Sequence, residues 1–400
     1  MPKKRMTGSN RRPWDVAVVG AGVFGAWTAK KLQEAGERVI LVDAWGPAHA
    51  RASSGGESRM ARGSYGSDEV YTRMALDSLA DWRALSDRAG QPIFHETGVL
   101  FFFPHADSFL ELTMEVHRRL GLPTELLDSA AMRQRFPQID FTGIEAGVFE
   151  PHFGALMARR GVQTVVAEFV RAGGTYQQLA VSPPDPEGHW LGDIQGLNPA
   201  TSALEIVPAS RIVFACGPWL GKLFPALLGP RIFPTRQEVF FFAPQPGDRR
   251  FEEGQLPGWA DFNCGDMYYG FPDLEGRGFK IAHDAHGPAI DPDVGDRTSS
   301  PEALADVRAF MARRFPHMAD RPLSESRVCQ YENSSNGDFL IDRHPTLENV
   351  FLVGGGSGHG FKHGPAVGRY AADLVMDRLQ TPEPRFSLAT KAEVQHRSVH

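Results

Sequence analysis

The chain has 400 residues, of which 42% are hydrophobic and 22% are charged, so it is expected to fold into two or three domain-sized units. A formal net charge of -6 argues against nucleic acid as the main partner, because phosphate binding needs a basic surface. The longest apolar runs, such as Val99–Phe103, are strand-sized and too short to cross a bilayer. Its three cysteines, Cys216, Cys264 and Cys329, are too few for a disulfide framework or a four-ligand zinc site, and we expect a cytoplasmic protein.

The two ends of the chain are expected to lie outside the fold. Residues 1–12 are basic and polar, and a strand pattern follows them directly instead of the apolar core of a signal peptide. We therefore expect a disordered leader there, and a C-terminal tail over residues 386–400.

A strand, a glycine turn, a helix and a second strand follow the leader. Residues 15–19 form a short apolar run, and residues 26–35 favour a helix that stops at Gly36. Residues 38–42 form a second buried strand, which ends on Asp43. This order predicts a βαβ unit with an acidic residue at the end of its second strand.

The turn between the first strand and the helix has the pattern Gly-x-Gly-x-x-Gly. Gly20 permits a tight turn, Gly22 lets the backbone approach a pyrophosphate, and Gly25 lets the helix pack closely on the strand. The helix N-terminus favours a phosphate, and Asp43 can accept a hydrogen bond from a ribose hydroxyl. The turn alone does not distinguish NAD from FAD, and a glycine turn that binds nothing is the alternative. Asp43 in place of an arginine disfavours a cofactor with a 2′-phosphate.

The remaining elements mix nucleotide-type strands with aromatic-rich material. A polar, glycine-rich stretch at 47–66 precedes a helix that Ser67 could cap, and residues 181–208 are expected to form hairpins or loops. Further strands are expected at Val99–Phe103, Arg211–Ala215, Val239–Phe242 and Val350–Val353. Further helices are expected at Phe109–Leu120, at Ala303–Phe315 after Ser300-Pro301, and from the glycine turn 354–360 through Leu379.

Nucleotide-type strands therefore recur at the beginning, middle and end of the chain. The predicted fold class is an α/β Rossmann-type nucleotide-binding domain plus an α+β substrate domain with a mixed, largely antiparallel sheet. The nucleotide-binding domain would be discontinuous and comprise 13–90, 155–235 and 325–385. The substrate-binding domain would comprise 91–154 and 236–324.

Four strings lie in order along the chain: the turn at 20–25, Gly56-Glu57-Ser58-Arg59 with Arg62 and Tyr65-Gly66, Tyr268-Tyr269-Gly270-Phe271-Pro272, and Gly358-His359-Gly360-Phe361-Lys362. In residues and spacing they resemble the FAD-dependent amine oxidases of the D-amino acid oxidase superfamily, of the monomeric sarcosine oxidase and N-methyltryptophan oxidase type. The resemblance extends from about residue 15 to about residue 379, and it is far more specific than any one motif.

The resemblance implies FAD as the cofactor. The residues that it implies for FAD binding are Gly20, Gly22, Val23, Phe24, Gly25, Asp43, Ala44, Ser54, Arg59, Cys329, Gly356, Gly358, His359, Gly360 and Lys362. It also implies a covalent link, because Cys329-Gln330-Tyr331 matches the Cys-x-Tyr string in which the family's cysteine forms a thioether with the flavin methyl group. Nearby positive charge would give that cysteine thiolate character. Without the resemblance, a free buried cysteine is the alternative.

The resemblance also implies catalytic roles for Lys280, Arg62, Lys362, Tyr269 and Tyr331. Lys280 would lie over the flavin and stabilise the charge that develops as dioxygen is reduced. The alternative is a solvent-facing strand residue. Because Phe279 and Ile281 would share the opposite face of the strand, the Lys280 side chain must point to water or into a cavity.

Arg62 and Lys362 match the family's positions that bind the substrate carboxylate by charge-assisted hydrogen bonds. A phosphate or surface contact is the alternative for Arg62, with Arg59 competing for the role, and a surface charge at a helix end is the alternative for Lys362. Two positions depart from the family pattern. Asp284 stands where a histidine follows the catalytic lysine, with His283 one place earlier, and Gly55 replaces a histidine near the flavin. These departures put sarcosine itself in doubt as the substrate.

The resemblance thus implies an enzyme that oxidises the carbon–nitrogen bond of a secondary amine or N-methyl amino acid to an imine and reduces dioxygen to hydrogen peroxide. The alternatives are an FAD-dependent dehydrogenase with another electron acceptor, and a flavin-binding subunit without activity. We expect a monomer whose partners are a small amine substrate and dioxygen, without nucleic acid or membrane. No metal site is expected, because His359 and His363 lie outside any His-Glu-x-x-His string.

Overall fold

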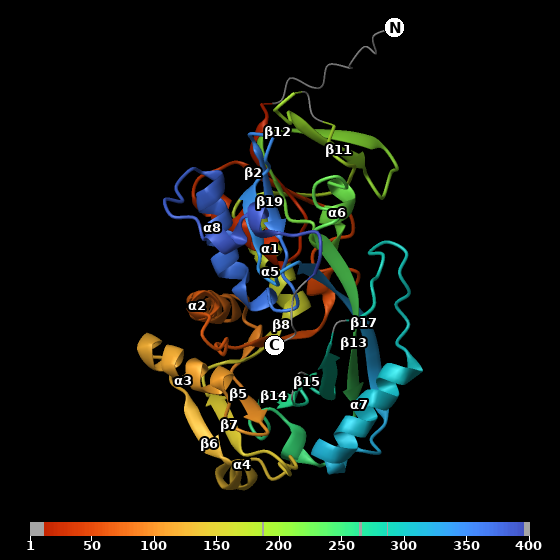
Figure 1. Cartoon of the computed structure of the whole chain (residues 1–400). Coiled ribbons are helices and arrows are strands. Elements are labelled where there is room, and N and C mark those ends of the chain that lie inside the picture. Colours follow the sequence, from red (N-terminus) through yellow and green to blue (C-terminus); the bar gives the residue numbers. More distant parts are fainter. Residues whose placement is uncertain (1–11, 186–187, 264–265, 286, 396–400) are drawn as a thin grey trace.

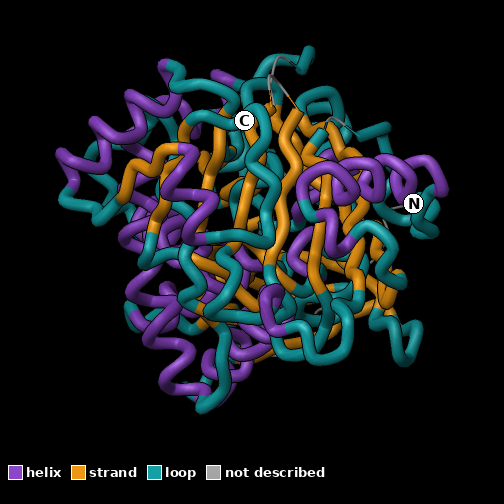
Figure 2. The backbone as a smooth tube through the Cα atoms, turned by 90° about the horizontal axis from the view of Figure 1, so that it is seen from below, coloured by secondary structure: helices purple, strands orange, loops and turns teal. Residues whose placement is uncertain are grey.

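The computed structural model describes residues 12–185, 188–263, 266–285 and 287–395. Within these ranges the strands form two eight-stranded sheets and one three-stranded sheet. Figure 1 shows the first sheet in the upper part of the molecule and the second sheet in the lower part, with β13 and β17 of the second sheet extending toward the first. Seen from below, the strands occupy the middle and the helices lie around them (Figure 2). The predicted leader, except Arg12, and Cys264 lie outside the described residues.

The first sheet has a parallel centre. Its strands are β1 (Trp14–Val19), β2 (Val39–Asp43), β9 (Thr175–Gln178), β10 (Ala180–Val181), β11 (Asp193–Leu197), β12 (Leu204–Phe214), β18 (Leu340–Arg343) and β19 (Val350–Gly354). Parallel pairing joins β19 to β12, β12 to β1, β1 to β2 and β2 to β9. Strands from the beginning, middle and end of the chain thus lie side by side, and the predicted Rossmann-type class is confirmed.

Helices surround the sheets. They are α1 (Val23–Glu34), α2 (Glu69–Ala89), α3 (Ser108–Leu120), α4 (Ser129–Arg135), α5 (Ala158–Arg171), α6 (Leu220–Leu223), α7 (Pro301–Arg314) and α8 (Gly364–Val375). α1 packs against α5 and α8, and the rings of Trp27 and Trp82 meet edge to face with centroids 5.3 Å apart. In the described part of the chain, no helix is both long and apolar enough to cross a membrane.

The turn between β1 and α1 depends on glycine at two positions. Gly20 has φ +105°, and a Cβ there would lie 2.3 Å from the carbonyl oxygen of Ala215 at the end of β12. A Cβ on Gly25 would lie 1.9 Å from the carbonyl oxygen of Gly20. Any side chain at either position would push the helix away from the sheet, so the predicted close packing of helix and strand is present.

The second sheet is mixed and largely antiparallel. Its strands are β5 (Val99–Phe103), β6 (Glu125–Asp128), β7 (Ala146–Glu150), β13 (Ile232–Phe242), β14 (Gly258–Asn263), β15 (Asp266–Phe271), β16 (Phe279–Asp284) and β17 (Leu323–Ser334). The pairs of this sheet are antiparallel except that β14 runs parallel to β5. A small third sheet joins β3 (Ser58–Ala61), β4 (Phe94–His95) and β8 (Gly154–Met157).

Strand alternation gives the second sheet two different faces. One face packs on α4 and α7 and contains Phe240, Phe242, Trp259, Phe279 and Ile281. The other face carries Lys280 and Asp284 from β16, and Lys280 reaches Ser58 of β3 in the third sheet. The aromatic core on the first face therefore fixes the side on which Lys280 lies.

Several boundaries differ in detail from the sequence prediction. The helix expected after Ser67 has Asp68 as its N-cap residue, and the polar, glycine-rich stretch at 47–66, for which no strand was predicted, contains β3. The proposed domain boundaries at residues 235 and 325 fall inside β13 and β17, because these two long strands pair with each other across the junction. At the C-terminal end, the expected tail begins in a short helix, Pro384–Phe386, whose Phe386 is buried.

Candidate functional site

A cavity of about 380 Å³ opens at the carboxyl ends of β1, β2 and β12. This is the end of a parallel sheet at which nucleotides bind. Its wall contains Gly20, Gly22, Val23, Phe24, Asp43, Ala44, Ser54, Arg59, Tyr331, Gly356, Gly358 and Gly360 from the predicted site. It also contains Cys216, Trp219, Asp293 and Glu332, which the sequence analysis did not assign to the cofactor.

The glycine turn is held from two sides. Asp43 Oδ2 accepts a hydrogen bond from the Ala21 amide at 2.8 Å, and its Oδ1 accepts from the amides of Trp45 and Gly46 at 2.8 Å each. Ser54 Oγ accepts from the Val23 amide at 3.0 Å, at the N-terminus of α1. Burial raises the pKa of Asp43 above its ordinary value. The turn, the acid and the helix N-terminus thus form one rigid wall of the cavity.

Cys329 lies beside a guanidinium group. Arg59 donates from Nη2 to the Cys329 sulfur at 3.1 Å and to the Ser53 carbonyl oxygen at 2.7 Å. Cys329 is buried, and strand alternation places it on the same face of β17 as Tyr331. Arg59 therefore places a positive charge beside the Cys329 sulfur, and it also lines the cavity.

Lys280 is buried rather than solvated. Only 1% of the residue is exposed, and its Nζ donates to the carbonyl oxygen of Ser58 at 2.7 Å and to Ser58 Oγ at 3.2 Å. The rings of Phe271 and Tyr269 lie 5.3 and 5.9 Å from Nζ. Burial, together with the neighbouring Arg59, holds the pKa of Lys280 well below its ordinary range. The alternative of a solvent-facing strand residue does not describe this side chain.

Arg62 and Lys362 come from distant parts of the chain and contact the same ring. The Arg62 guanidinium carbon lies 4.2 Å and the Lys362 Nζ lies 5.0 Å from the centre of the Tyr65 ring. Arg62 is 8% exposed and Lys362 is 4% exposed. Their hydrogen bonds go to the backbone carbonyl oxygens of Ser64 and His359. Among the described residues, neither cation forms an ion pair with a carboxylate, so the pair can receive an anion.

Asp284 belongs to the same group of buried side chains. It lies on the Lys280 face of β16, and its cross-strand partner on β15 is Met267. Burial, with the Asp284 charge next, raises the pKa of Tyr269 to about 12 and that of Tyr331 well above its ordinary value. Burial and repulsion from Arg62 hold the pKa of Lys362 well below its ordinary range, although Asp284 acts in the opposite direction. The acid thus lies among Tyr269, Tyr331 and Lys362.

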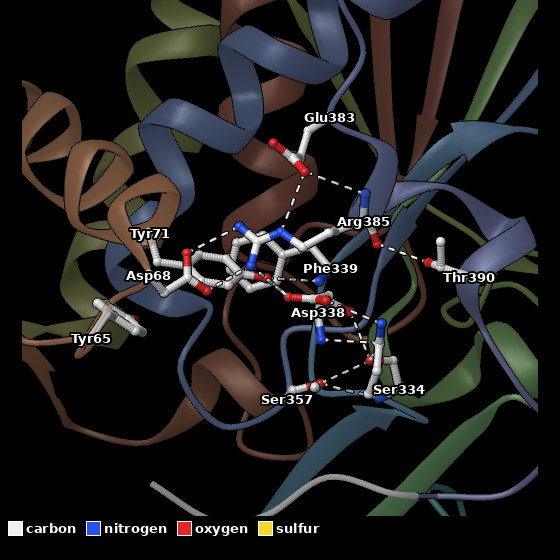
Figure 3. A network of polar contacts seen from close by, with 12 residues as sticks. Tyr65, Asp68, Tyr71, Ser334, Asp338, Phe339, Ser357, Glu383, Arg385 and Thr390 are labelled. Carbon is white, nitrogen blue, oxygen red and sulfur yellow. Dashed lines mark hydrogen bonds and ion pairs between the residues drawn. The ribbon is translucent and has the colours of Figure 1, made fainter. Parts of the chain in front are cut away.

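A polar network that includes Ser357 of the glycine turn joins distant parts of the chain (Figure 3). Arg385, from the C-terminal segment, donates to both carboxylate oxygens of Asp68 at 2.6 and 3.0 Å. The Tyr71 hydroxyl donates to Asp338 at 2.9 Å, and the neighbouring ring of Phe339 stacks on His359 with centroids 5.0 Å apart. The C-terminal segment therefore helps to fix the loop that carries His359 and Lys362.

Four of the predicted cofactor residues do not line the cavity itself. Gly25 packs on the Gly20 backbone, and the His359 ring points to Tyr65, with 3.1 Å between His359 Nδ1 and the Tyr65 hydroxyl. Cys329 contacts Arg59, which lies in the cavity wall, and Lys362 lies near Arg62. The structure thus separates the predicted set into a nucleotide cavity and an adjoining cluster of Lys280, Arg62, Lys362, Asp284 and Tyr269, with Tyr331 between the two.

The residues that the sequence analysis missed had weak signals. Cys216 and Trp219 follow the carboxyl end of a nucleotide-type strand, a position at which ligands bind. Glu332 follows Tyr331 and lines the cavity. A negatively charged side chain is not expected beside the two phosphates of FAD, so an argument from charge alone does not select this residue. Asp293 reaches the cavity from a loop distant in sequence, and no pattern in the sequence indicates this contact.

Comparison with known proteins identifies relatives in sequence and in structure. The family described as FAD dependent oxidoreductase matches residues 15–374. Monomeric sarcosine oxidase of Bacillus sp. (strain B-0618) is 31% identical over 377 residues, covering 91% of this chain and 92% of the relative. N-methyl-L-tryptophan oxidase of Salmonella newport is 29% identical, covering 94% of this chain and 97% of the relative. L-proline dehydrogenase from P. horikoshii superposes with a TM-score of 0.81 at 19% identity, covering 94% of this chain and 97% of that one.

The chain therefore belongs to the FAD dependent oxidoreductase family, and it is similar over most of its length to sarcosine and N-methyltryptophan oxidases. The residues present fit FAD. Glycine at Gly20 and Gly22 keeps the turn narrow, and the Glu332 Oε2 atom is buried in the cavity wall without a hydrogen-bond partner in the described part of the chain. FAD would be held by the turn at residues 20–24, by Asp43 and by the glycine turn at residues 356–360.

Proposed function

We propose that this enzyme oxidises the carbon–nitrogen bond of a secondary amine or N-methyl amino acid to an imine, with dioxygen reduced to hydrogen peroxide. One observation carries the proposal: two buried cations, Arg62 and Lys362, lie next to the cluster that contains Lys280, and neither is paired with a carboxylate within the described ranges. Bound FAD would supply the redox chemistry, accepting hydride from the carbon next to nitrogen.

The side chains of the cluster would then bind and orient the substrate and stabilise developing charge. Arg62 and Lys362 would bind the substrate carboxylate and hold the amine in one orientation. Tyr269 and Tyr331, whose pKa values are raised by burial, would form neutral walls around the amine. Lys280 would provide positive charge where dioxygen gains electrons. The roles of Arg62, Lys362 and Lys280 are supported by the burial of these side chains. The roles of Lys280 and Tyr269 are supported by their place on one face of the second sheet.

A panel of amines assayed for hydrogen peroxide tests this function against its alternatives. The oxidase should release about one peroxide for each amine consumed, because dioxygen is its second substrate. A dehydrogenase with another acceptor would reduce an artificial dye rapidly but form little peroxide. A flavin-binding subunit would do neither. The fold is shared with an L-proline dehydrogenase, so the fold alone does not decide among these three.

We also propose that FAD is attached to Cys329 through a thioether, since Arg59 lies 3.1 Å from the sulfur. We expect the yellow colour to stay with the chain after acid precipitation, and Cys329→Ser to release it into the supernatant. The measurement is the absorption spectrum of the two fractions. As a control, Cys216→Ser should leave the colour with the precipitated chain, because burial raises the pKa of Cys216 well above its ordinary value. Free FAD in the supernatant of the unmutated protein would refute the link.

The protein is proposed to act as a cytoplasmic monomer. The proposal is supported by the similarity to a relative named monomeric sarcosine oxidase and by a site whose parts come from one chain. We expect sedimentation equilibrium to give a mass near 44.0 kDa at micromolar concentration. A mass twice as large, independent of dilution, would contradict it.

A further inference from the structure

A buried acid in the cavity wall has no part in the roles described above. Glu332 follows Tyr331 on β17, and only 8% of it is exposed. Because side chains alternate along a strand, Glu332 points away from the face that carries Cys329 and Tyr331, and it lines the cofactor cavity from the other side.

One oxygen of this carboxyl group is bonded and the other is not. Oε1 accepts a hydrogen bond from the Gly356 amide at 3.1 Å, whereas Oε2 has no partner among the residues that the structure describes. Leaving a buried polar atom unpaired is costly, so such atoms usually face a ligand or a bound water. Glu332 lines a cavity that is large enough for part of a dinucleotide, and its unpaired Oε2 is buried in the wall of that cavity.

Two glycines, Gly217 and Gly356, lie next to the carboxyl oxygens of Glu332. A Cβ on Gly217 would lie 3.2 Å from Oε2, and a Cβ on Gly356 would lie 3.1 Å from Oε1. Gly217 also has φ +54°, a backbone conformation that favours glycine. Glycine at these two positions therefore lets both turns lie close to the carboxyl group of Glu332.

We propose that Glu332 binds FAD as a neutral carboxylic acid, donating a hydrogen bond from Oε2 to the polar chain between the adenosine and the ring system, so that FAD binding is coupled to proton uptake. The pyrophosphate carries two negative charges into the same cavity, and an ionised Glu332 would repel them. The neutral acid, in contrast, offers a donor to a phosphate or hydroxyl oxygen while Oε1 keeps its bond to Gly356.

The expected pH dependence follows from the groups around the cavity. Burial raises the pKa of Glu332 to about 7. Below that pH the acid is already neutral. Above it, Glu332 must take up a proton from the solvent when FAD binds, so the affinity for FAD falls as the pH rises. The other titratable side chains in the wall are Asp43, His49, Cys216 and Tyr331, and the charged ones are Arg59, Lys222 and Asp293.

The effect of Glu332 between pH 6 and 8 is separated from that of these neighbours by comparing variants that differ only at Glu332. Burial lowers the pKa of His49, and it raises that of Cys216 and that of Tyr331 well above their ordinary values. Burial also lowers the pKa values of Lys280 and Lys362, which lie in the adjoining cluster. Because both lysines are present in every protein compared, a difference caused by changing Glu332 alone reports on Glu332.

The test measures FAD binding by the Cys329→Ser chain, in which no thioether can form, by quenching of FAD fluorescence. Between pH 6 and 8 the dissociation constant should rise about tenfold, as expected for one ionisation near pH 7. With Glu332→Gln added, it should stay constant within about twofold, because the amide remains a donor at every pH. Glu150→Gln, which changes a buried acid outside the cavity, should follow the Cys329→Ser chain. A Glu332→Gln variant that shows the same rise, or a Cys329→Ser chain that shows none, would overturn the proposal.

A second measurement needs no change at Glu332. Calorimetric titration of FAD into the Cys329→Ser chain at pH 8, in two buffers of different ionisation enthalpy, should show uptake of about one proton per FAD. No uptake would contradict the proposal even if Glu332→Gln failed to fold. Neither experiment uses an amine, so their outcome is independent of the proposed oxidation reaction.

Discussion

Replacing Lys280 by methionine is expected to slow the reaction of the reduced enzyme with dioxygen by about 10²–10³-fold, the range seen when one group that stabilises developing charge is removed. Reduction of the flavin by substrate should stay within about threefold of its original rate, because that half of the reaction builds up no anion beside Lys280. Stopped-flow absorbance in anaerobic and aerated solutions measures the two rates separately.

The pH dependence of the same rate provides a second readout. Burial and Arg59 lower the pKa of Lys280, so the ammonium form is lost as the pH rises through that lowered value. The reaction with dioxygen should therefore be fastest at low pH and should lose this dependence in Lys280→Met. Lys31→Met, which removes an amine 3.4 Å from Asp81 on the protein surface, is the control and should change neither rate. Equal slowing of both half-reactions would remove Lys280 from its proposed role.

An N-methyl amino acid should exceed the matching N-methyl amine in kcat/KM by about 30-fold to several thousand-fold, the equivalent of about 2–5 kcal/mol for a buried charge pair. The physical reason is the pair of buried cations, Arg62 and Lys362, which form no ion pair with a carboxylate in the described part of the chain. In Lys362→Met most of this preference should disappear, because one of the two charge-assisted bonds is lost. The measurement is kcat/KM for both substrates in both proteins.

Asp284 acts against this preference, since a carboxylate among Tyr269, Tyr331 and Lys362 weakens the attraction for an anion. We expect the two cations to dominate, and Asp284→Asn to increase the preference for the carboxylate. The control is Lys391→Met, because Lys391 is a buried lysine bonded to the Arg385 carbonyl oxygen, outside the cluster. An amine that equals the amino acid in the unmutated enzyme would show that the pocket is built for another substrate.

The fold was predictable where a local pattern determines it. The turn at residues 20–25 requires glycine where its backbone lies close to neighbouring backbone atoms. This requirement produces glycines at a fixed spacing that can be recognised in the sequence. Val99–Phe103 has the bounds that its apolar run predicts. By contrast, β3 was missed because Ser58–Ala61 becomes a strand only through pairing with β8, nearly 100 residues later in the chain. The paths of β13 and β17 depend in the same way on distant partners.

The site was predictable where strand alternation or the resemblance applied. The burial of Lys280 follows from the apolar residues on both sides of it, once the opposite face is known to be core. That Arg62 and Lys362 lie close together could be predicted only from the resemblance, because 300 residues separate them in the sequence. In the structure both cations contact the ring of Tyr65. Glu332 was missed because its raised pKa depends on burial, which no local pattern of residues reports.

The order of strands in the first sheet sets the moment during synthesis at which the cofactor can be bound. β12 lies between β1 and β19, and the glycine turn after β19 completes the cavity wall. A ribosome-bound chain that has exposed only the N-terminal βαβ unit thus has a phosphate-binding turn but no closed cavity. With FAD held as proposed, stable uptake would wait until the residues around Gly360 have left the ribosome. The cofactor would then be acquired by a nearly complete chain rather than by its first folding unit.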